Sequence, residues 1–172
     1  LAGSMVNPIL ATVYMGCEQV LQTHGYSMLL ATSSNDPHLD VAYLRLMSRR
    51  RVDGLIVSSA VARFDLAADL VSSINIPTVM LDRDAPAGAR VSAVVSDHAA
   101  GMREAVLHLV SLGHRRIALV NGFANVRPFR ERLDGYHAGL QAAGVTVQPN
   151  IVSSVPVTES AGYVQAQMLL DM

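Results

Sequence analysis

Residues 91–122 read VSAVVSDHAAGMREAVLHLVSLGHRRIALVNG and predict a strand, a helix and a second strand in succession. The β-branched run at residues 91–95 predicts a buried strand, and Asp97 after it is a residue type that caps helices. Apolar side chains then recur at helical spacing and predict one buried stripe: Met102, Ala105, Val106, Leu109 and Leu112. Gly113 ends this helix before the apolar run at residues 117–120. A strand-helix-strand unit of this kind joins two parallel strands.

The same alternation continues on both sides of this unit. Towards the N-terminus, the pattern predicts helices after Asn7-Pro8, after Asp36-Pro37 and over residues 67–74, with strands at residues 26–31, 55–59 and 78–81. Towards the C-terminus, it predicts a helix over residues 129–143, a strand over residues 151–155 and the start of a last helix. This alternation predicts a doubly wound α/β fold with parallel sheets. In such folds ligands bind at the edge formed by the carboxyl ends of the strands.

Each predicted helix has an apolar stripe that we expect to face a sheet. The first helix is expected to bury Leu10, Val13, Cys17, Val20 and Leu21, and the second Leu39, Ala42, Tyr43, Leu46 and Met47. The helix over residues 129–143 is expected to bury Phe129, Leu133, Tyr136, Leu140 and Ala143, and the last helix Ala161, Val164 and Met168.

The composition restricts the class of protein. Apolar residues make up 51% of the chain and charged residues 16%, which predicts an ordered globular protein. The net charge of -1 argues against nucleic-acid binding through bulk positive charge. The single cysteine, Cys17, excludes an internal disulfide. No apolar run is long enough to span a bilayer and no signal peptide is visible, so we expect a cytoplasmic protein without membrane contact.

The sequence contains none of the common catalytic or cofactor motifs. The histidines are scattered without HExxH or paired Cys/His spacing, and GxSxG, GxGxxG and GxxxxGK[ST] are absent. We therefore expect no metal site, no cofactor and no enzymatic activity. The first helix has no strand before it and the last has none after it, so we expect this chain to be part of a longer protein.

Seven phrases in one fixed order resemble a known family. They are Asn7-Pro8 before a helix, HGYSMLLATSSNDP, RRVDGLIV, IPTVMLDR, VSDHAAG, HLVSLGHRRIALVNG and RERLDGYHAGLQAAG. Together they are similar to the effector-binding region of the lactose-repressor/galactose-repressor (LacI/GalR) family of bacterial transcription regulators. The similarity extends over essentially the whole chain.

This resemblance implies a periplasmic-binding-protein-like fold with two subdomains, over residues 1–96 and 97–172, the second of them incomplete. A small effector, often a sugar or a nucleobase, would bind in the cleft between them. Asp97 and His98 would lie at the hinge, where His98 replaces an asparagine that is frequent in the family. A helix-turn-helix that binds operator DNA would precede residue 1. The regulator would be a homodimer, with the helices over residues 7–24 and 36–50 as candidates for its interface.

The resemblance also implies ligand contacts at particular positions. Asp82 and Arg83 match a position that often contacts the effector, and an aspartate can accept two hydrogen bonds from sugar hydroxyls. The alternative for this pair is a solvated turn. Arg132 matches the family arginine before Gly-Tyr in RLDGY, and its planar fork suits bidentate contacts. The alternative is a basic helix start that faces water.

Three further positions are weaker candidates. Ser58 at a strand end is a candidate hydroxyl contact. Leu10 and its neighbour Ile9 stand where family members frequently have aromatic residues, so one of them is expected to line the cleft without stacking on the ligand. Phe129 is either an aromatic ligand surface or, as its helix stripe favours, a core residue.

These inferences predict the ligand-sensing and dimerisation domain of a DNA-binding transcription regulator. A sugar-binding protein of a transport system is the alternative, because it has the same fold and cleft. A helix-turn-helix or a signal peptide in the full-length protein would distinguish the two.

Overall fold

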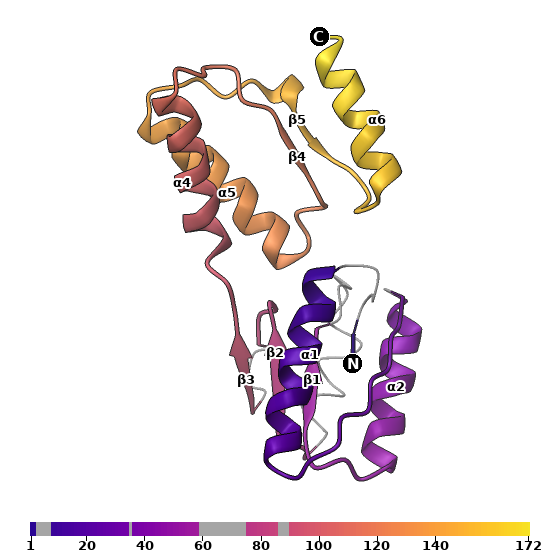
Figure 1. Ribbon diagram of the computed structural model, residues 1–172. Coiled ribbons are helices and arrows are strands. Elements are labelled where there is room, and N and C mark those ends of the chain that lie inside the picture. The colour runs from indigo at the N-terminus through magenta and orange to yellow at the C-terminus, as the bar shows by residue number, and fades with distance from the viewer. Residues whose placement is uncertain (3–7, 35, 59–74, 86–89) are drawn as a thin grey trace. The chain divides into compact units, whose positions relative to one another are not determined.

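The chain forms two compact units (Figure 1). This computed structural model describes residues 1–2, 8–34, 36–58, 75–85 and 90–172. The first unit is Leu1–Val94 and the second is Val95–Met172. The helix predicted over residues 67–74, and also Asn7 and Ser59, lie outside the described residues.

The first unit contains a parallel sheet and two described helices. Its elements are α1 (Pro8–Thr23), α2 (Pro37–Arg49), β1 (Leu55–Val57), β2 (Thr78–Leu81) and β3 (Val91–Val94). The strand order is β1-β2-β3, and both pairings are parallel. Leu1 and Ala2 lie beside β1, since the Ser58 amide donates to the Leu1 carbonyl at 2.9 Å and the Ala2 amide to the Ala31 carbonyl at 2.8 Å.

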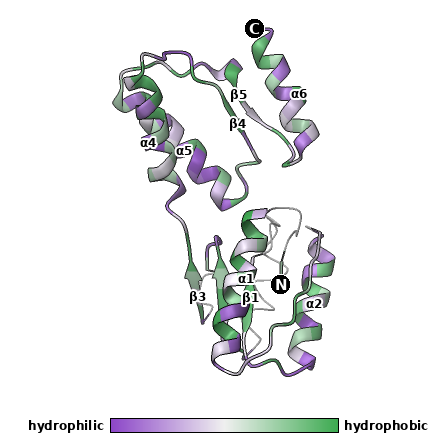
Figure 2. Cartoon of the chain, in the orientation of Figure 1, coloured by the Kyte–Doolittle hydropathy of each residue, from purple (hydrophilic) through white to green (hydrophobic). Residues whose placement is uncertain are grey.

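The two helices cover opposite faces of this sheet. Val57 of β1 packs in a core cluster with Leu44 and Met47 of α2. Successive residues of a strand point to opposite faces, so Ser58 points away from α2. The Ser58 hydroxyl is hydrogen-bonded to Tyr14 of α1, which puts α1 on the other face. The predicted doubly wound α/β fold is confirmed, and Figure 2 shows the hydrophobic strands on which it is built.

The predicted faces of α1 and α2 are partly wrong. The buried side chain of α1 is Tyr14, whereas Val20 is 60% exposed. In α2 the buried residues are Asp40, Leu44 and Met47, and the exposed apolar residues include Leu39 and Leu46. Both helices have apolar side chains on more than one face, so their periodicity allowed two interpretations.

Two strand predictions also need correction. Residues 26–31 are not assigned as a strand; next to them, Thr32 forms an isolated parallel bridge with Ala2, and the Ala31 carbonyl accepts a hydrogen bond from the Ala2 amide. The strand expected to be buried at residues 91–95 is largely exposed, because β3 is the edge of the described sheet.

The second unit is built on a pair of parallel strands. Its elements are α4 (His98–Ser111), β4 (Leu119–Asn121), α5 (Arg127–Ala142), the 3-10 turn η1 (Pro149–Ile151), β5 (Val152–Ser154) and α6 (Glu159–Leu170). β4 pairs with β5 in register from Leu119↔Val152 to Asn121↔Ser154. The helices and strands predicted for this half are confirmed within a few residues.

Two glycines bring α4 and α5 into close contact. A Cβ built on Gly135 would lie 2.2 Å from the Ala99 carbonyl oxygen, and one on Gly139 would lie 2.8 Å from the Val106 Cβ. Tyr136, which lies between these two glycines in the sequence, is buried, and its phenol donates to the Ile117 carbonyl at 2.8 Å. Small residues at these positions are therefore required by packing rather than by backbone conformation.

The last helix, α6, buries fewer apolar side chains than its sequence pattern predicts. Val164 and Met168 are 54% and 59% exposed, and the half-buried positions of α6 include Ala161 and Leu169. On α4 the expected stripe is correct at Val106 but not at Leu112, which is exposed. Among the described residues, no helix combines the length and hydrophobicity needed to cross a membrane.

Candidate functional site

Two polar positions of the first unit lie at the carboxyl edge of its sheet. Ser58 directly follows β1, and Asp82 directly follows the neighbouring parallel strand β2. The phenol of Tyr14, from α1, forms a hydrogen bond with the Ser58 hydroxyl. This edge therefore brings together side chains that are far apart in the sequence, as expected of a doubly wound fold.

Tyr14 and Ser58 form a buried hydroxyl pair. Their exposed fractions are 5% and 3%. Burial raises the pKa of the Tyr14 phenol, whereas the hydrogen bond with Ser58 and the charge of Arg83 act in the opposite direction. The pair has two hydroxyl protons and uses one in the bond between its members.

Asp82 has an unusual backbone conformation. Its φ is 50°, in the left-handed region, which aspartate tolerates better than most residues. The Asp82 amide donates to the Val94 carbonyl at 2.8 Å, which ties the end of β2 to the last residue of the first unit.

The Arg83 side chain is held close to its own strand end. Its Nη1 donates to the Asp82 carbonyl at 2.6 Å. Burial lowers the pKa of the guanidinium, and the charges of Asp82, Asp84 and Asp40 oppose that shift. The group stays charged near neutral pH. Within the described residues, the three carboxylates that act on this guanidinium favour an uncharged ligand that donates hydrogen bonds over an anion.

In the second unit, the end of β4 holds the start of α5. The Asn121 side-chain amide donates to the Phe129 carbonyl at 2.7 Å. A Cβ built on Gly122 would lie 2.6 Å from the Phe129 ring, so the ring occupies the space of the missing side chain. The guanidinium of Arg132 lies over this ring, with Cζ 5.7 Å from the ring centroid.

Three arginines lie near each other on α5, and their contacts differ. Arg127 forms an ion pair with Glu131 at 2.5 Å, and Arg130 is exposed. Arg132 is half-buried, and the stack on Phe129 is its recorded interaction within the described residues. Its five N–H donors are thus available to a ligand.

The structure groups the predicted ligand residues into two sets. Ser58, Asp82 and Arg83 lie at the carboxyl edge of the first unit, and Phe129 and Arg132 lie together on α5. Leu10 is half-buried in the first turn of α1, four residues before Tyr14 and so on the same helix face.

The two predicted hinge residues begin α4. Asp97 is its N-cap, and its Oδ1 accepts a hydrogen bond from the Ala100 amide at 2.8 Å. His98 is the first residue of the helix and is half-buried. Their role in a hinge stays a prediction.

Sequence reasoning missed Tyr14, Asn121 and Gly122. Tyr14 lies between Leu10 and Cys17 at helical spacing, a signal that a choice of Val13 and Val20 for the stripe obscured. Asn121 and Gly122 directly follow the apolar run at residues 117–120, and so lie at the carboxyl end of a strand, where ligands bind in such folds. Phe129, for which the helix stripe favours a core role, is half-buried and is not a member of the core cluster of the second unit.

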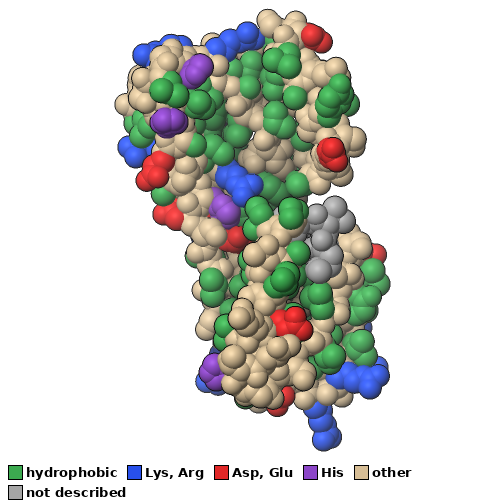
Figure 3. All heavy atoms as spheres, in the orientation of Figure 1, with side chains coloured by type: hydrophobic (Ala, Val, Ile, Leu, Met, Phe, Trp, Pro, Cys, Tyr) green, Lys and Arg blue, Asp and Glu red, His purple; other side chains and the backbone are tan. Residues whose placement is uncertain are grey.

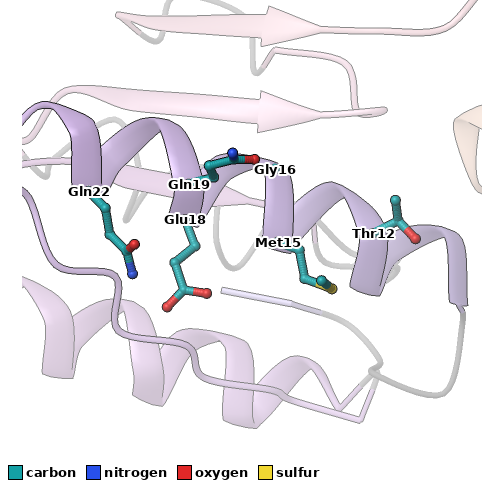
Figure 4. Close-up of a pocket in the computed structure, with 6 residues that line it drawn as sticks. All are labelled: Thr12, Met15, Gly16, Glu18, Gln19 and Gln22. Atoms are coloured by element: carbon teal, nitrogen blue, oxygen red, sulfur yellow. The ribbon is translucent and has the colours of Figure 1, made fainter.

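The outer face of α1 has a shallow hollow that is a weaker candidate (Figure 4). It is lined by Thr12, Met15, Gly16, Glu18, Gln19 and Gln22. All of these residues belong to one helix, and Glu18 and Gln22 project from the same side of it (Figure 4). A small-molecule site needs groups that converge from several elements, which this surface lacks.

Comparison with known proteins assigns the family. A family model described as "Periplasmic binding proteins and sugar binding domain of LacI family" matches residues 4–171. The chain belongs to this family. Its fold is the periplasmic-binding-protein-like fold that the sequence predicted, with mixed helices and parallel strands.

Relatives within the LacI family are regulators of transcription. The HTH-type transcriptional regulator DegA of Bacillus subtilis is 27% identical over 99% of this chain and 51% of its own length. The HTH-type transcriptional repressor PurR of Haemophilus influenzae is 30% identical over 91% of this chain and 46% of its own length. The chain therefore spans about half the length of the curated relatives it matches.

A solved structure has the same fold. The LacI family transcriptional regulator from Enterococcus faecium, crystallised with bound ribose, superimposes with a TM-score of 0.84 at 26% identity. The match covers 99% of this chain and 61% of that one.

Proposed function

We propose that this chain is the effector-sensing part of a LacI-family transcription regulator and that its effector is a small sugar. The observation that carries the proposal is that each unit, taken by itself, presents polar side chains that can bind a ligand: at the carboxyl edge of the sheet in the first unit, and on the first turns of α5 in the second. Tyr14 and Ser58 contribute hydroxyls and Asp82 a carboxylate in the first unit. Arg132 contributes a guanidinium in the second.

The chemistry of these groups suits a polyhydroxylated ligand. Sugar hydroxyls both donate and accept hydrogen bonds, so they match a carboxylate acceptor such as Asp82 and a donor such as Arg132. The carboxylates of Asp82, Asp84 and Asp40, which act on Arg83 among the described residues, disfavour a phosphorylated ligand at that edge. The ribose-bound structure of the Enterococcus faecium relative is consistent with this class of ligand.

The relatives favour a regulator over a transport protein. DegA and PurR are both named as HTH-type transcriptional proteins. We propose that DNA is bound by another segment of the full-length protein, because this chain has a net charge of -1. On the face drawn in Figure 3, basic side chains are scattered and do not form one patch. Because operator DNA would be its partner, we propose that the protein is cytoplasmic. We propose no catalytic reaction for it.

We propose that the regulator is a homodimer whose interface includes the exposed apolar faces of α1 and α2. On α1, Val13 and Val20 are exposed one heptad apart. On α2, Leu39 and Leu46 are exposed with the same spacing. Apolar side chains in such rows favour association with another protein surface.

In this proposal the effector acts through a difference in affinity. A ligand that binds one conformation of the protein more tightly shifts the population towards it, by no more than that difference in binding free energy. Operator affinity then changes by the same coupling factor.

A thermal-shift panel on the intact protein tests the proposal. The panel contains D-ribose, D-glucose, sucrose, cellobiose, a sugar phosphate and nucleobases. We expect a neutral sugar to raise the melting temperature and to change the affinity for the DNA upstream of the protein's own gene in a gel-shift assay. A panel without any shift, or a sugar that binds without any effect on DNA binding, would contradict the function.

The dimer has its own test. Val20→Glu puts a charge in the proposed interface and should convert the dimer to a monomer in analytical ultracentrifugation. Gln19→Glu is the matched control, since it adds the same charge to an exposed polar position of the same helix. An unchanged dimer in Val20→Glu would exclude this face as the interface.

A further inference from the structure

We propose that Phe129 and Gly122 are positioning residues for the ligand arginine Arg132. The missing side chain of Gly122 leaves room for the Phe129 ring, and the ring holds the guanidinium. This inference rests on the proposed function, in which Arg132 binds the effector. Gly122 and Phe129 then determine how the guanidinium of Arg132 is oriented towards the effector.

The first observation is that the Phe129 ring packs directly against Gly122. A Cβ at this glycine would lie 2.6 Å from Cδ2, 2.6 Å from Cε2 and 2.7 Å from Cζ of Phe129. Such distances are shorter than any van der Waals contact, so alanine at this position would displace the ring. Gly122 does not have a positive φ, unlike Gly25, Gly113 and Gly144. Space and not backbone freedom therefore requires glycine here.

The second observation is that the same strand end also fixes the backbone of Phe129. Asn121 is buried, and its Nδ2 donates to the Phe129 carbonyl at 2.7 Å. The Asn121 carbonyl accepts a hydrogen bond from the Val155 amide at 2.9 Å, which fixes the donor residue in turn. Main chain and ring of Phe129 are thus both held by the end of β4.

The third observation is the position of Arg132, three residues after Phe129 and so on the same face of α5. Its Cζ lies over the ring at 5.7 Å from the centroid, within the range of a cation–π contact. The neighbouring carboxylate of Glu131 is paired with Arg127 at 2.5 Å and does not compete for the guanidinium. Because the contact with the ring does not use a hydrogen-bond acceptor, the N–H donors of Arg132 are left for a ligand.

Two other roles for Phe129 fit these contacts less well. A core residue would pack in the cluster of Val106, Tyr136 and Leu140, of which Phe129 is not a member. A stacking surface for the ligand would need an uncovered ring, whereas Gly122 and Arg132 already occupy two of its sides.

The test combines binding and nuclear magnetic resonance on the intact protein. The variants are Phe129→Leu, Phe129→Tyr and Gly122→Ala, with D-ribose and D-glucose as probes in calorimetry. The Nε–Hε signal of Arg132 is assigned by its loss in Arg132→Lys and reports the ring current of Phe129. Gly101→Ala is the matched control, because a Cβ on this helical glycine meets nothing within 4 Å.

We expect Phe129→Leu and Gly122→Ala to weaken sugar binding about 5-fold, the loss typical of an exposed to half-buried cation–π contact. Both variants should also move the Arg132 signal away from its ring-shifted position. Phe129→Tyr, which retains a ring, and Gly101→Ala should behave as the wild type. In a Phe129→Leu background, Gly122→Ala should add little, since the two substitutions act on one contact.

Three outcomes would overturn the positioning role. One is an unchanged Arg132 signal with unchanged affinity in Phe129→Leu. Another is weaker binding with an unchanged signal, which would mean that the ring contacts the sugar itself. The third is a full additional loss from Gly122→Ala in the Phe129→Leu background. If the wild type binds no sugar, the proposed function fails, whereas the Arg132 signal still tests whether Phe129 positions the guanidinium.

Discussion

The phenol of Tyr14 and the hydroxyl of Ser58 share one hydrogen bond that joins α1 to the carboxyl end of β1. Both side chains are buried, and the bond identifies the face of the sheet that α1 covers. It also links a residue that sequence analysis overlooked to one that it selected. The stability of the first unit and the ligand contacts proposed for it therefore involve the same pair of hydroxyl groups.

Tyr14→Phe should lower the free energy of unfolding by about 1–2 kcal/mol, because the Ser58 hydroxyl loses its partner while it stays buried. Urea denaturation of the intact protein measures this. Tyr26→Phe is the control, since that side chain is exposed, and it should change stability by less than about 0.5 kcal/mol. Equal stability of the two variants would show that the buried bond contributes nothing.

Gly135→Ala should destabilise the second unit by about 2 kcal/mol or more, because the new Cβ would lie 2.2 Å from the Ala99 carbonyl oxygen. Gly139→Ala should act in the same direction against Val106. Gly101→Ala has open space around it and should stabilise α4 by up to about 1 kcal/mol. Thermal denaturation ranks the three variants, and the close helix contact is excluded if Gly135→Ala melts with Gly101→Ala.

The stability of the protein should fall above about pH 10, the ordinary pKa of tyrosine. Burial raises the pKa of the Tyr136 phenol, so the folded protein retains a proton that the unfolded chain releases. The stabilisation is complete below the unfolded pKa and is lost as the pH rises through the folded one. Tyr136→Phe should reduce the loss of stability between pH 9 and pH 11 in denaturant titrations. An identical pH dependence in wild type and variant would contradict this assignment.

Asp97→Ala should cost about 1 kcal/mol, since the Asp97 carboxylate caps α4 through the Ala100 amide. Asp97→Asn retains a side-chain oxygen acceptor and should recover most of that stability. If Asp97 also acts in a hinge, the two variants will differ from wild type in how the effector changes DNA affinity. Should Asp97→Ala change stability alone, with a normal response to the effector, the hinge role is excluded and the cap remains.

Most of the architecture could be predicted because each strand and helix has a local signal. The elements predicted over residues 91–122 appear in the structure as β3, α4 and β4, although β3 belongs to the sheet of the first unit and β4 to the sheet of the second, so the two strands do not pair in one sheet. Helix ends were predictable as well, since Asp36 and Asp97 cap α2 and α4 as their residue types suggest. The order of the sequence motifs shared with the family then predicted the periplasmic-binding-protein-like fold.

The faces of the helices were harder to predict. Val13 and Val20 are as apolar as a core residue, yet the side chain that α1 buries is Tyr14, whose hydroxyl finds a partner in Ser58. A sequence pattern does not show such a partner, because the two residues are 44 positions apart. Val164 and Met168 likewise form a stripe on α6 that the described residues do not bury.

The candidate site was predictable in part for the same reason. Asp82, Arg83 and Arg132 stand in short family phrases, so their positions could be inferred one at a time. Phe129 packs against Gly122 through a contact between a helix and a strand end, which a local sequence pattern does not show. The helix stripe alone therefore favoured a position for Phe129 in the core, whose cluster does not include it. Contacts of this kind are tertiary and have no local signature.

Asp82 separates two tasks on different atoms of one residue. Its side chain is the proposed acceptor for the sugar, whereas its amide, at a φ of 50°, fastens the end of β2 to Val94. Glycine at this position would retain the left-handed backbone and the fastening while it removes the carboxylate. A β-branched residue such as valine would strain the backbone as well. The proposed recognition of the sugar and the hydrogen bond between the neighbouring strands can thus be tested separately by substitutions at this one position.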